Sequence, residues 1–445
     1  VAGTERVKIP KLNCNGNNCT ELEIPPTLHD PDGYTLNYAT HWWDASMIYG
    51  SNLAQQKLVR TFRNGKLVVG KKPLNLKLDR KTGLPITSVT NNWWIGLSLM
   101  HSIFFAEHNY LADKLSKEYP TWNDEQIFQQ VRIIIAAILA KIHTVEWTPA
   151  ILNNAVLRAG MNVNWYGISQ AFNYTVEQLL QLGVPPSAKL ILEQAQKGVG
   201  CVSNLYGNPY AMSEEFVSVY RMHSLLPDYI TVIKTKNIKN KNKYAKILLS
   251  QLTFKNAEKQ LKRFSIENWI NTFGYTRSGH LVFNNYPDFL THVKLNNKKI
   301  VNLGVIDIVR DRERLGLRYN ELCCQLQLEP LISFTNLSVT EGEAKQLVNI
   351  YENNIEMVDV LVGLMAEANW PFGYGFSNTA FQIFIIMASR RIEADRFFQE
   401  YYNADTYTQL GIDYIQNESF KSILLRNIPD LAENLANVTN VFVPW

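Results

Sequence analysis

Residues 213–228 read SEEFVSVYRMHSLLPD, and this stretch decides how the chain is interpreted. Ser213 followed by two glutamates is typical of a helix start, and we expect that helix to run through His223 and to end at Pro227. Tyr220 and His223 would then be three residues apart on one helix, so both side chains would leave the same face. An imidazole that binds a metal beside a phenol fits this spacing. A buried tyrosine and an ordinary hydrogen-bonded histidine fit it too.

The rest of the chain is predicted to be mostly helical. Apolar residues repeat every three and four positions from Val131 to Ile142, which is typical of a long, mostly buried helix. Asn123 precedes this helix as an N-cap, and Gln126 follows where a capping box needs it. Further helices are expected over 95–119, 344–365 and 379–400, with scattered short strands such as 66–69. We therefore expect a mostly α fold that forms a single large helical domain.

Composition excludes several classes of protein. Of the 445 residues, 46% are hydrophobic and 19% charged, which indicates a folded core rather than disorder. Six lysines lie between residues 234 and 246, and removing their six charges turns the net charge of +4 into −2. The basic charge therefore belongs to one loop, and nucleic-acid binding is not expected. Cys14 and Cys19 could close a small disulfide loop in an oxidising compartment. The longest apolar run, 131–142, is too short to span a bilayer.

Several further blocks, together with YRMHSLLPD, resemble one known family in order along nearly the whole chain. The resemblance is to the fatty-acid α-dioxygenases of the cyclooxygenase and animal haem peroxidase superfamily. It implies a single helical haem peroxidase-like catalytic domain over residues 1–445. The blocks are HWWDASMIYGSN (41–52), FFAEHNYLADKL (104–115), AKIHTVEWT (140–148), AGMNVNWYG (159–167), RDRERLGLRYNEL (310–322), VLVGLMAE (360–367) and IMASRRIEADRFF (386–398).

By this resemblance Tyr220 would form a catalytic radical, and His223 would be the proximal ligand of a haem b iron. Animal haem peroxidases usually carry arginine where this chain has Tyr220, so tyrosine favours radical oxygenation of a lipid. Asp307 would orient the imidazole, although a surface or salt-bridged acid is the alternative. Arg310 would meet a haem propionate, with an ion pair on the helix surface as the alternative.

The loop from Thr40 to Ser46 resembles the calcium loop of the superfamily. The side chains of Thr40, Asp44 and Ser46 and the carbonyl of Trp42 are the hard oxygen ligands that Ca²⁺ prefers. One carboxylate is little charge for such a site, and an ordinary turn is the alternative.

His143, Thr148 and Arg391 match the residues that hold the substrate carboxylate in the α-dioxygenases. The planar guanidinium of arginine can bind a carboxylate through two hydrogen bonds. Spacing alone does not distinguish Arg391 from Arg390, and only the motif does. A core histidine and a solvent-exposed arginine are the alternatives.

The distal histidine of the superfamily has no match before the loop at 40–46, because His29 lies in the turn-like stretch LHDPDGY. We expect that the chain lacks this N-terminal distal-haem helix, or that the helix has been lost. If the distal histidine is truly absent, no base remains to move the proton in peroxide cleavage.

The expected function is haem-dependent oxygenation of fatty acids at C2 by a tyrosyl radical, giving 2-hydroperoxy fatty acids. The expected partners are a fatty acid and O₂ as substrates and a hydroperoxide as activator, with haem b and Ca²⁺ as cofactors. Peripheral membrane contact is compatible with the sequence, and localisation is left open. A haem peroxidase of small donors and a non-catalytic haem- or lipid-binding remnant are the alternatives.

Overall fold

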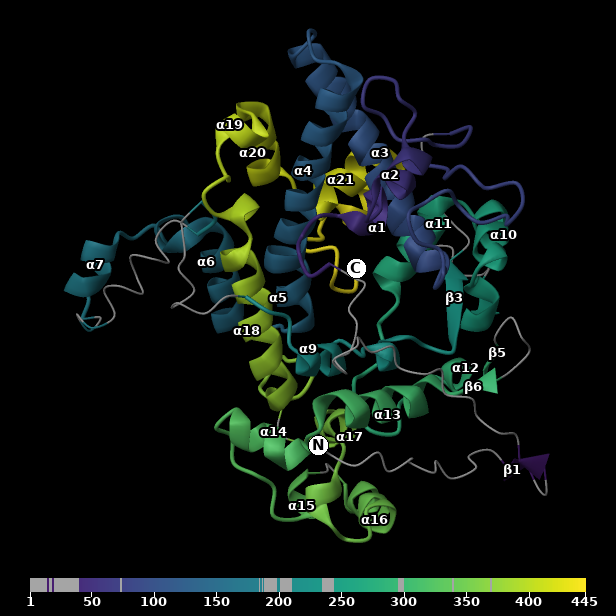
Figure 1. The fold of residues 1–445 in the computed structure, drawn as a ribbon, viewed down its shortest axis with the longest axis vertical. Coiled ribbons are helices and arrows are strands. Elements are labelled where there is room, and N and C mark those ends of the chain that lie inside the picture. Colours follow the sequence, from purple (N-terminus) through teal and green to yellow (C-terminus); the bar gives the residue numbers. More distant parts are fainter. Residues whose placement is uncertain are drawn as a thin grey trace.

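The computed structural model describes residues 14–15, 18–19, 40–72, 74–183, 185, 187, 198–200, 210–233, 244–294, 300–337, 340–368 and 370–445. Helices dominate these residues, and the strands are short and pair only in antiparallel two-stranded sheets, which confirms the predicted mostly α fold (Figure 1). The strand pairs are β1 (Cys14–Asn15) with β2 (Asn18–Cys19), β3 (Tyr229–Ile233) with β4 (Tyr244–Leu248), and β5 (Val293–Lys294) with β6 (Ile300–Val301).

The helices of the first half are α1 (Ser46–Tyr49), α2 (Leu53–Val59), α3 (Ile95–Glu118), α4 (Asp124–Ile142), the π-helix η1 (His143–Trp147), α5 (Thr148–Ile151), α6 (Ala155–Phe172), α7 (Val176–Gln181), α9 (Glu214–Val219) and the 3₁₀ helix η4 (His223–Leu225).

Those of the second half are η5 (Leu249–Leu252), α10 (Lys255–Arg263), α11 (Ile266–Tyr275), α12 (Asp288–Thr291), α13 (Leu303–Leu315), α14 (Tyr319–Gln325), α15 (Phe334–Leu337), α16 (Glu341–Ile350), η6 (Ile355–Met357), α17 (Val360–Ala366), α18 (Asn378–Ala394), η7 (Arg396–Phe398), α19 (Ala404–Tyr407), α20 (Gln409–Asn417), α21 (Phe420–Asn427), η8 (Pro429–Leu431) and α22 (Ala432–Leu435).

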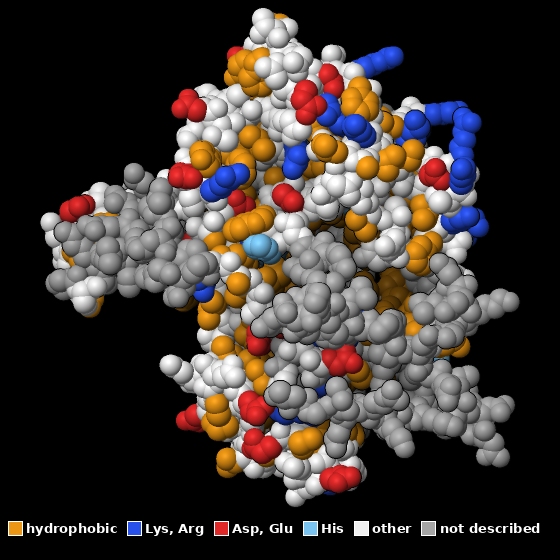
Figure 2. Space-filling view, in the orientation of Figure 1, with side chains coloured by type: hydrophobic (Ala, Val, Ile, Leu, Met, Phe, Trp, Pro, Cys, Tyr) orange, Lys and Arg blue, Asp and Glu red, His pale blue; other side chains and the backbone are white. Residues whose placement is uncertain are grey.

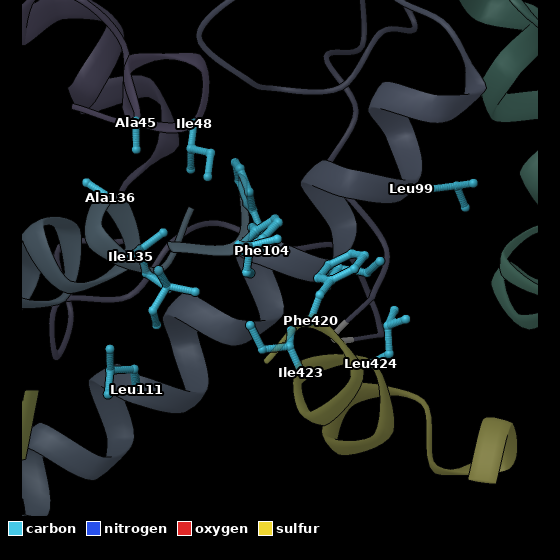
Figure 3. Close-up of a cluster of buried hydrophobic side chains, with 14 of the residues drawn as sticks. Ala45, Ile48, Leu99, Phe104, Leu111, Ile135, Ala136, Phe420, Ile423 and Leu424 are labelled. Carbon is cyan, nitrogen blue, oxygen red and sulfur yellow. The ribbon is translucent and has the colours of Figure 1, made fainter. Parts of the chain in front are cut away.

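One hydrophobic core is built around α3 and α4, which pack against each other and against α20 and α21. Asn123 caps α4 as predicted, and Asn123 and Gln126 form a complete capping box. Phe104 of α3 stacks on Phe420 of α21 at a ring distance of 5.9 Å, inside the cluster shown in Figure 3. The predicted helices over 95–119 and 131–142 are thereby confirmed, because their apolar faces form this core.

A second core surrounds α18 and includes residues from α9, α14, α16 and α17. In Figure 1, α14, α16 and α17 lie in the lower part of the molecule, and α18 runs through its middle. The chain of α4 continues without a break through η1 into α5, and Trp147 at the end of η1 packs on the second core. The segment around His143 therefore lies where the two cores meet.

Three predicted helices are shorter than expected. The helix predicted over 379–400 ends at Ala394, and the separate 3₁₀ helix η7 follows it. The helix predicted to run through His223 ends at Val219, and His223 begins the separate turn η4. The reason is tertiary: Tyr220 contacts His143, whereas Arg221 and His223 both contact Asp307. Residues two positions apart on a regular helix do not face the same side, so an unbroken helix could not direct both Arg221 and His223 at Asp307.

The helix predicted over 344–365 is divided into α16, η6 and α17. The chain turns between α16 and α17 and brings Asp359, which is 3% exposed, to the guanidinium groups of Arg312 and Arg318. Those ion pairs outweigh the local helical periodicity.

The apolar run at 131–142 belongs to a longer helical stretch. Asp124–Ile151 is long and apolar enough to cross a membrane by length and composition, but 67% of its most apolar window is buried inside the protein, which is typical of a core helix. Figure 2 shows acidic and basic side chains intermingled over much of the described part of one face. Most of the lysine-rich loop, residues 234–243, lies outside the described residues.

Candidate functional site

Tyr220 and His143 form the centre of the site. The Tyr220 hydroxyl lies 3.2 Å from Nε2 of His143, within hydrogen-bond distance. The Tyr220 ring stacks on Phe384 of α18 at 5.7 Å and contacts Phe216 of α9 at 4.5 Å. Trp147 lies almost parallel to the His143 ring at 4.8 Å. Aromatic rings from α9, α18 and η1 therefore hold the phenol against the imidazole.

The π-helix η1 places His143 in this position. A π-helix contains an extra residue in its turn, so it redirects the side chains that follow α4. Thr148 donates its hydroxyl to the backbone carbonyl of His143 at 2.8 Å and is itself fully buried. The only hydroxyl proton of Thr148 is therefore engaged inside the π-turn, and Thr148 fixes the position of His143. Direct donation to a carboxylate requires that bond to break.

The surroundings keep His143 neutral. Burial, with the neighbouring charge of Arg391, lowers the pKa of His143 to about 3. Burial also raises the pKa of Tyr220. The side chain of Tyr220 has an exposed fraction of 38%, yet protein atoms crowd the ring closely enough to disfavour the phenolate. A neutral phenol next to a neutral imidazole can therefore transfer a proton only when the phenol becomes a much stronger acid.

Arg391, near the end of α18, is a half-buried cation that forms no salt bridge within the described chain, although the charges of Asp395 and Asp44 favour its charged form. Its Nη2 donates to the carbonyl of Trp42 at 3.0 Å, and its guanidinium lies over the Trp43 ring at 4.3 Å. The Trp43 ring also contacts His143 at 5.1 Å. Burial lowers the pKa of Arg391, which means that this position disfavours the charge.

Three buried donor groups around Arg391 have no acceptor in the part of the chain that the structure describes. They are Nε of Arg391, Nε1 of Trp43 and the hydroxyl of Tyr210. Buried donors of this kind are rare in proteins and each is costly. A small anion held by Arg391 would offer the acceptors that the protein does not.

His223 follows Tyr220 by three residues in the chain. Its Nδ1 faces two oxygen atoms, one of Asp307 and one of Tyr286. Oδ2 of Asp307 is 3.1 Å away, without hydrogen-bond alignment, and the Tyr286 hydroxyl is 3.3 Å away. Arg221 donates to Oδ1 of Asp307 at 2.5 Å, so the carboxylate is held from its other side. Nδ1 is therefore the engaged nitrogen, while no described residue bonds Nε2. Arg221 and Tyr286 were not predicted as site residues, because their partners lie 86 and 63 positions away and such contacts leave no local sequence signal.

Arg310 lies on α13, one helical turn beyond Asp307. Its Nε is buried without an acceptor in the described chain, and burial lowers its pKa, followed by the charges of Arg314 and Arg221. These features leave Arg310 available to an anion that is not part of the described protein.

In the loop at 40–46, three of the four predicted calcium ligands accept hydrogen bonds within the protein. Trp42 directs its carbonyl at the guanidinium of Arg391, Thr40 accepts from the Trp42 backbone, and Asp44 accepts from the Ser46 backbone at 2.9 Å. Within the described residues, no group of three or more His, Cys, Asp or Glu side chains could hold a metal ion. The Thr40 hydroxyl, the Trp42 carbonyl and one Asp44 oxygen thus have partners within the protein.

An apolar cavity of about 630 Å³ lies next to Trp147 and Leu225, although Tyr220, His143, His223 and Arg391 do not line it. Trp147, which stacks on His143, forms part of its wall, and so does Leu225, which shares the turn η4 with His223. The remaining wall is mainly apolar and includes Leu97, Met100 and Phe273. The cavity suits a flat or chain-like apolar group, as small-molecule sites generally do.

Comparisons with known proteins match this arrangement. The family model described as animal haem peroxidase matches residues 10–442. Alpha-dioxygenase 2 of Arabidopsis thaliana is 34% identical over 95% of this chain and 67% of its own length. Alpha-dioxygenase PIOX of Oryza sativa subsp. japonica is 33% identical over 99% of this chain and 72% of its own length. The chain thus spans about two thirds of the length of such relatives.

Solved structures agree with the sequence relatives. The Oryza sativa fatty acid alpha-dioxygenase is 32% identical, with a TM-score of 0.83 over 95% of this chain and 70% of that one. A substituted form of that enzyme, solved with palmitic acid, gives the same values. Peroxidase A of Dictyostelium discoideum, 19% identical with a TM-score of 0.70, shares the fold.

Proposed function

Since the chain belongs to the animal haem peroxidase family and to its fatty-acid α-dioxygenases, which are oxidoreductases, we propose that it oxygenates a long-chain fatty acid at C2. The observation that carries the proposal is the half-buried Arg391, which forms no salt bridge with the described residues and lies beside the hydrogen-bonded pair His143–Tyr220. A fatty-acid carboxylate bound to Arg391 would form the direct ion pair that the described residues do not provide. The next carbon, C2, would then be the part of the substrate nearest to the phenol of Tyr220.

Haem is the cofactor that the family implies, and the residues around His223 fit it. His223 would hold the iron through Nε2, because Nδ1 faces Asp307 and Tyr286. Arg310 would meet a propionate, which would supply an acceptor for its buried Nε. When bound, the haem together with a hydroperoxide would supply the one-electron oxidation of Tyr220.

The protein's own groups would then carry the reaction. As Tyr220 loses an electron, its hydroxyl proton would pass to Nε2 of His143, which is neutral and within reach. The Tyr220 oxygen would take a hydrogen atom from C2, and O₂ would add to the carbon radical. The resulting peroxyl radical would take a hydrogen atom back from the Tyr220 hydroxyl. The fatty acid and O₂ would thus combine into a 2-hydroperoxy acid, and the tyrosyl radical would be restored.

Calcium is the other predicted cofactor, at Thr40, Trp42, Asp44 and Ser46. We propose it only with two requirements: Arg391 must release the Trp42 carbonyl, and a further carboxylate must join Asp44. Melting of the full chain with CaCl₂ and with EGTA tests this part. An increase in melting temperature with Ca²⁺ that disappears in Asp44→Asn supports the site, and equal melting curves reject it.

The function is tested by oxygen uptake of the haem-reconstituted chain with palmitate, followed by mass spectrometry for the 2-hydroperoxy product. Tyr220→Phe should abolish uptake, while Tyr174→Phe, which alters an exposed tyrosine, should leave it unchanged. Uptake that persists in Tyr220→Phe would contradict the radical role. Guaiacol oxidation without any lipid product would favour a peroxidase instead.

A further inference from the structure

His143, Thr148 and Arg391, the residues predicted to hold the substrate carboxylate, are called the carboxylate clamp below. Tyr210 is not one of them, but its hydroxyl oxygen is buried and can donate a hydrogen bond. It lies four residues before the start of α9, the helix that precedes Tyr220. Its ring contacts the rings of His41 at 5.5 Å and Trp42 at 5.9 Å. The backbone carbonyl of Trp42 in turn accepts from Arg391. The short segment 41–42 therefore touches Tyr210 with its rings and Arg391 with its carbonyl, which places both residues around the same spot.

The hydroxyl of Tyr210 has no hydrogen-bond partner within the described chain, although its oxygen is buried. An unsatisfied buried hydroxyl is costly, and a ligand that accepts a hydrogen bond from it would remove that cost. Burial raises the pKa of Tyr210, while the charges of Arg391 and Arg390 oppose that rise. The hydroxyl therefore remains a protonated donor at neutral pH, with two cations near it.

Two residues of the carboxylate clamp, Thr148 and His143, already have hydrogen-bond partners within the protein. Thr148 already donates to the carbonyl of His143, and Nε2 of His143 is engaged with Tyr220. A carboxylate can accept about four hydrogen bonds. Arg391 can donate two of them, and the Tyr210 hydroxyl, like Nε1 of Trp43, is a buried donor near Arg391 without an acceptor in the described chain.

We propose that Tyr210 is a substrate-binding residue whose hydroxyl donates to the fatty-acid carboxylate held by Arg391. This inference rests on the proposed function, because it names a further recognition group at the same site. Tyr210 would act on binding and orientation, while Tyr220 alone would act on the hydrogen atom at C2.

The test is direct binding of palmitate to the full chain, measured by isothermal titration calorimetry without turnover. Tyr210→Phe removes only the hydroxyl and keeps the ring contacts. A hydrogen bond to a charged group contributes about 1.5–3 kcal/mol, and about 1.4 kcal/mol is a tenfold change. We therefore expect the Kd for palmitate to rise by about tenfold or more, with the Kd for hexadecanol changed less than about threefold because that ligand has no charge. Tyr174→Phe is the matched control and should change neither value.

In oxygen uptake, Tyr210→Phe should raise KM for palmitate by a similar factor and leave kcat nearly unchanged. Equal palmitate affinity in wild type and Tyr210→Phe would overturn the proposal. An equal loss of affinity for palmitate and hexadecanol would also overturn it, because it would indicate a packing role. Failure of the proposed function is seen separately, as oxygen uptake that survives in Tyr220→Phe.

Discussion

Glu146 lies in the π-helix η1, as His143 does. Substitution of Glu146 tests quantitatively how much its hydrogen bond to α21 and its protonation state contribute to stability. Both carboxylate oxygens accept from the backbone N–H of Phe420, at 3.0 and 3.1 Å, at the start of α21. Burial raises the pKa of Glu146 from 4.5 to about 7, although the Phe420 hydrogen bonds and Lys141 oppose the rise. The folded protein therefore binds a proton at Glu146 more strongly than the unfolded chain does.

The sign follows from this difference in pKa. The stability contributed by protonated Glu146 is fully present below about pH 4.5 and is lost as pH rises through about 7. The difference amounts to roughly 3 kcal/mol at most, since a tenfold change in a proton equilibrium is about 1.4 kcal/mol. With an unfolding entropy of about 2.1 cal/mol/K per residue, a chain of 445 residues should change its melting temperature by roughly 3 °C.

The perturbation is Glu146→Gln, which keeps one oxygen for Phe420 and cannot ionise. When the pH rises from 5 to 8, the melting temperature of the wild type should fall by roughly 3 °C more than that of Glu146→Gln. Thermal unfolding followed by circular dichroism measures both melting temperatures. Glu118→Gln, at an exposed position, is the control and should follow the wild type. Parallel melting-temperature profiles of wild type and Glu146→Gln would refute the reasoning, because they would mean that Glu146 titrates normally in the fold.

Three further variants test the fold and the support of His223. Asn123→Ala removes the cap of α4 and should cost about 1 kcal/mol, which urea unfolding can measure. Gly363→Ala places a methyl group 2.1 Å from Cδ2 of Tyr319, so a loss of about 1–3 kcal/mol is expected, and unchanged stability would mean that α17 moves freely. Asp307→Asn removes the charge that pairs with Arg221 and should lower the melting temperature of the haem-free chain. It should also change the iron–imidazole stretching frequency of the haem-reconstituted chain. An unaltered frequency would mean that Asp307 does not influence the imidazole of His223.

Local sequence patterns predicted the helices whose stability is local. The helix after Asn123 was predicted because its cap, its first-turn acids and its apolar repeat all lie within about twenty residues. The same approach was wrong for the helix through His223. Arg221 pairs with Asp307, 86 positions away, and that contact leaves no periodic signal around residue 221. The helix predicted over 344–365 was divided for the same kind of reason, since Asp359 pairs with Arg312 and Arg318.

The site shows the same division. Motifs in the sequence identified Tyr220, His143 and Arg391, and the structure brings these three around one spot. The roles assigned to them, and those of Thr148, His223, Asp307 and Arg310, stay predictions until the variants are measured. Tyr210 carried no motif signal, because its significance depends on an unsatisfied hydroxyl that only three-dimensional packing reveals.

The sequence by itself determined the helical class of the fold, the long buried helix and its cap, and the identity of the residues that resemble a radical and carboxylate site. These follow from periodicity, capping chemistry and ordered motifs, which are all written in short stretches of chain. Only the tertiary structure decided where the helix before His223 ends, which atom faces which, and that Arg391 forms no salt bridge within the described protein. Those outcomes depend on contacts between residues that are tens to hundreds of positions apart, where burial changes the cost of each charge and each unpaired donor.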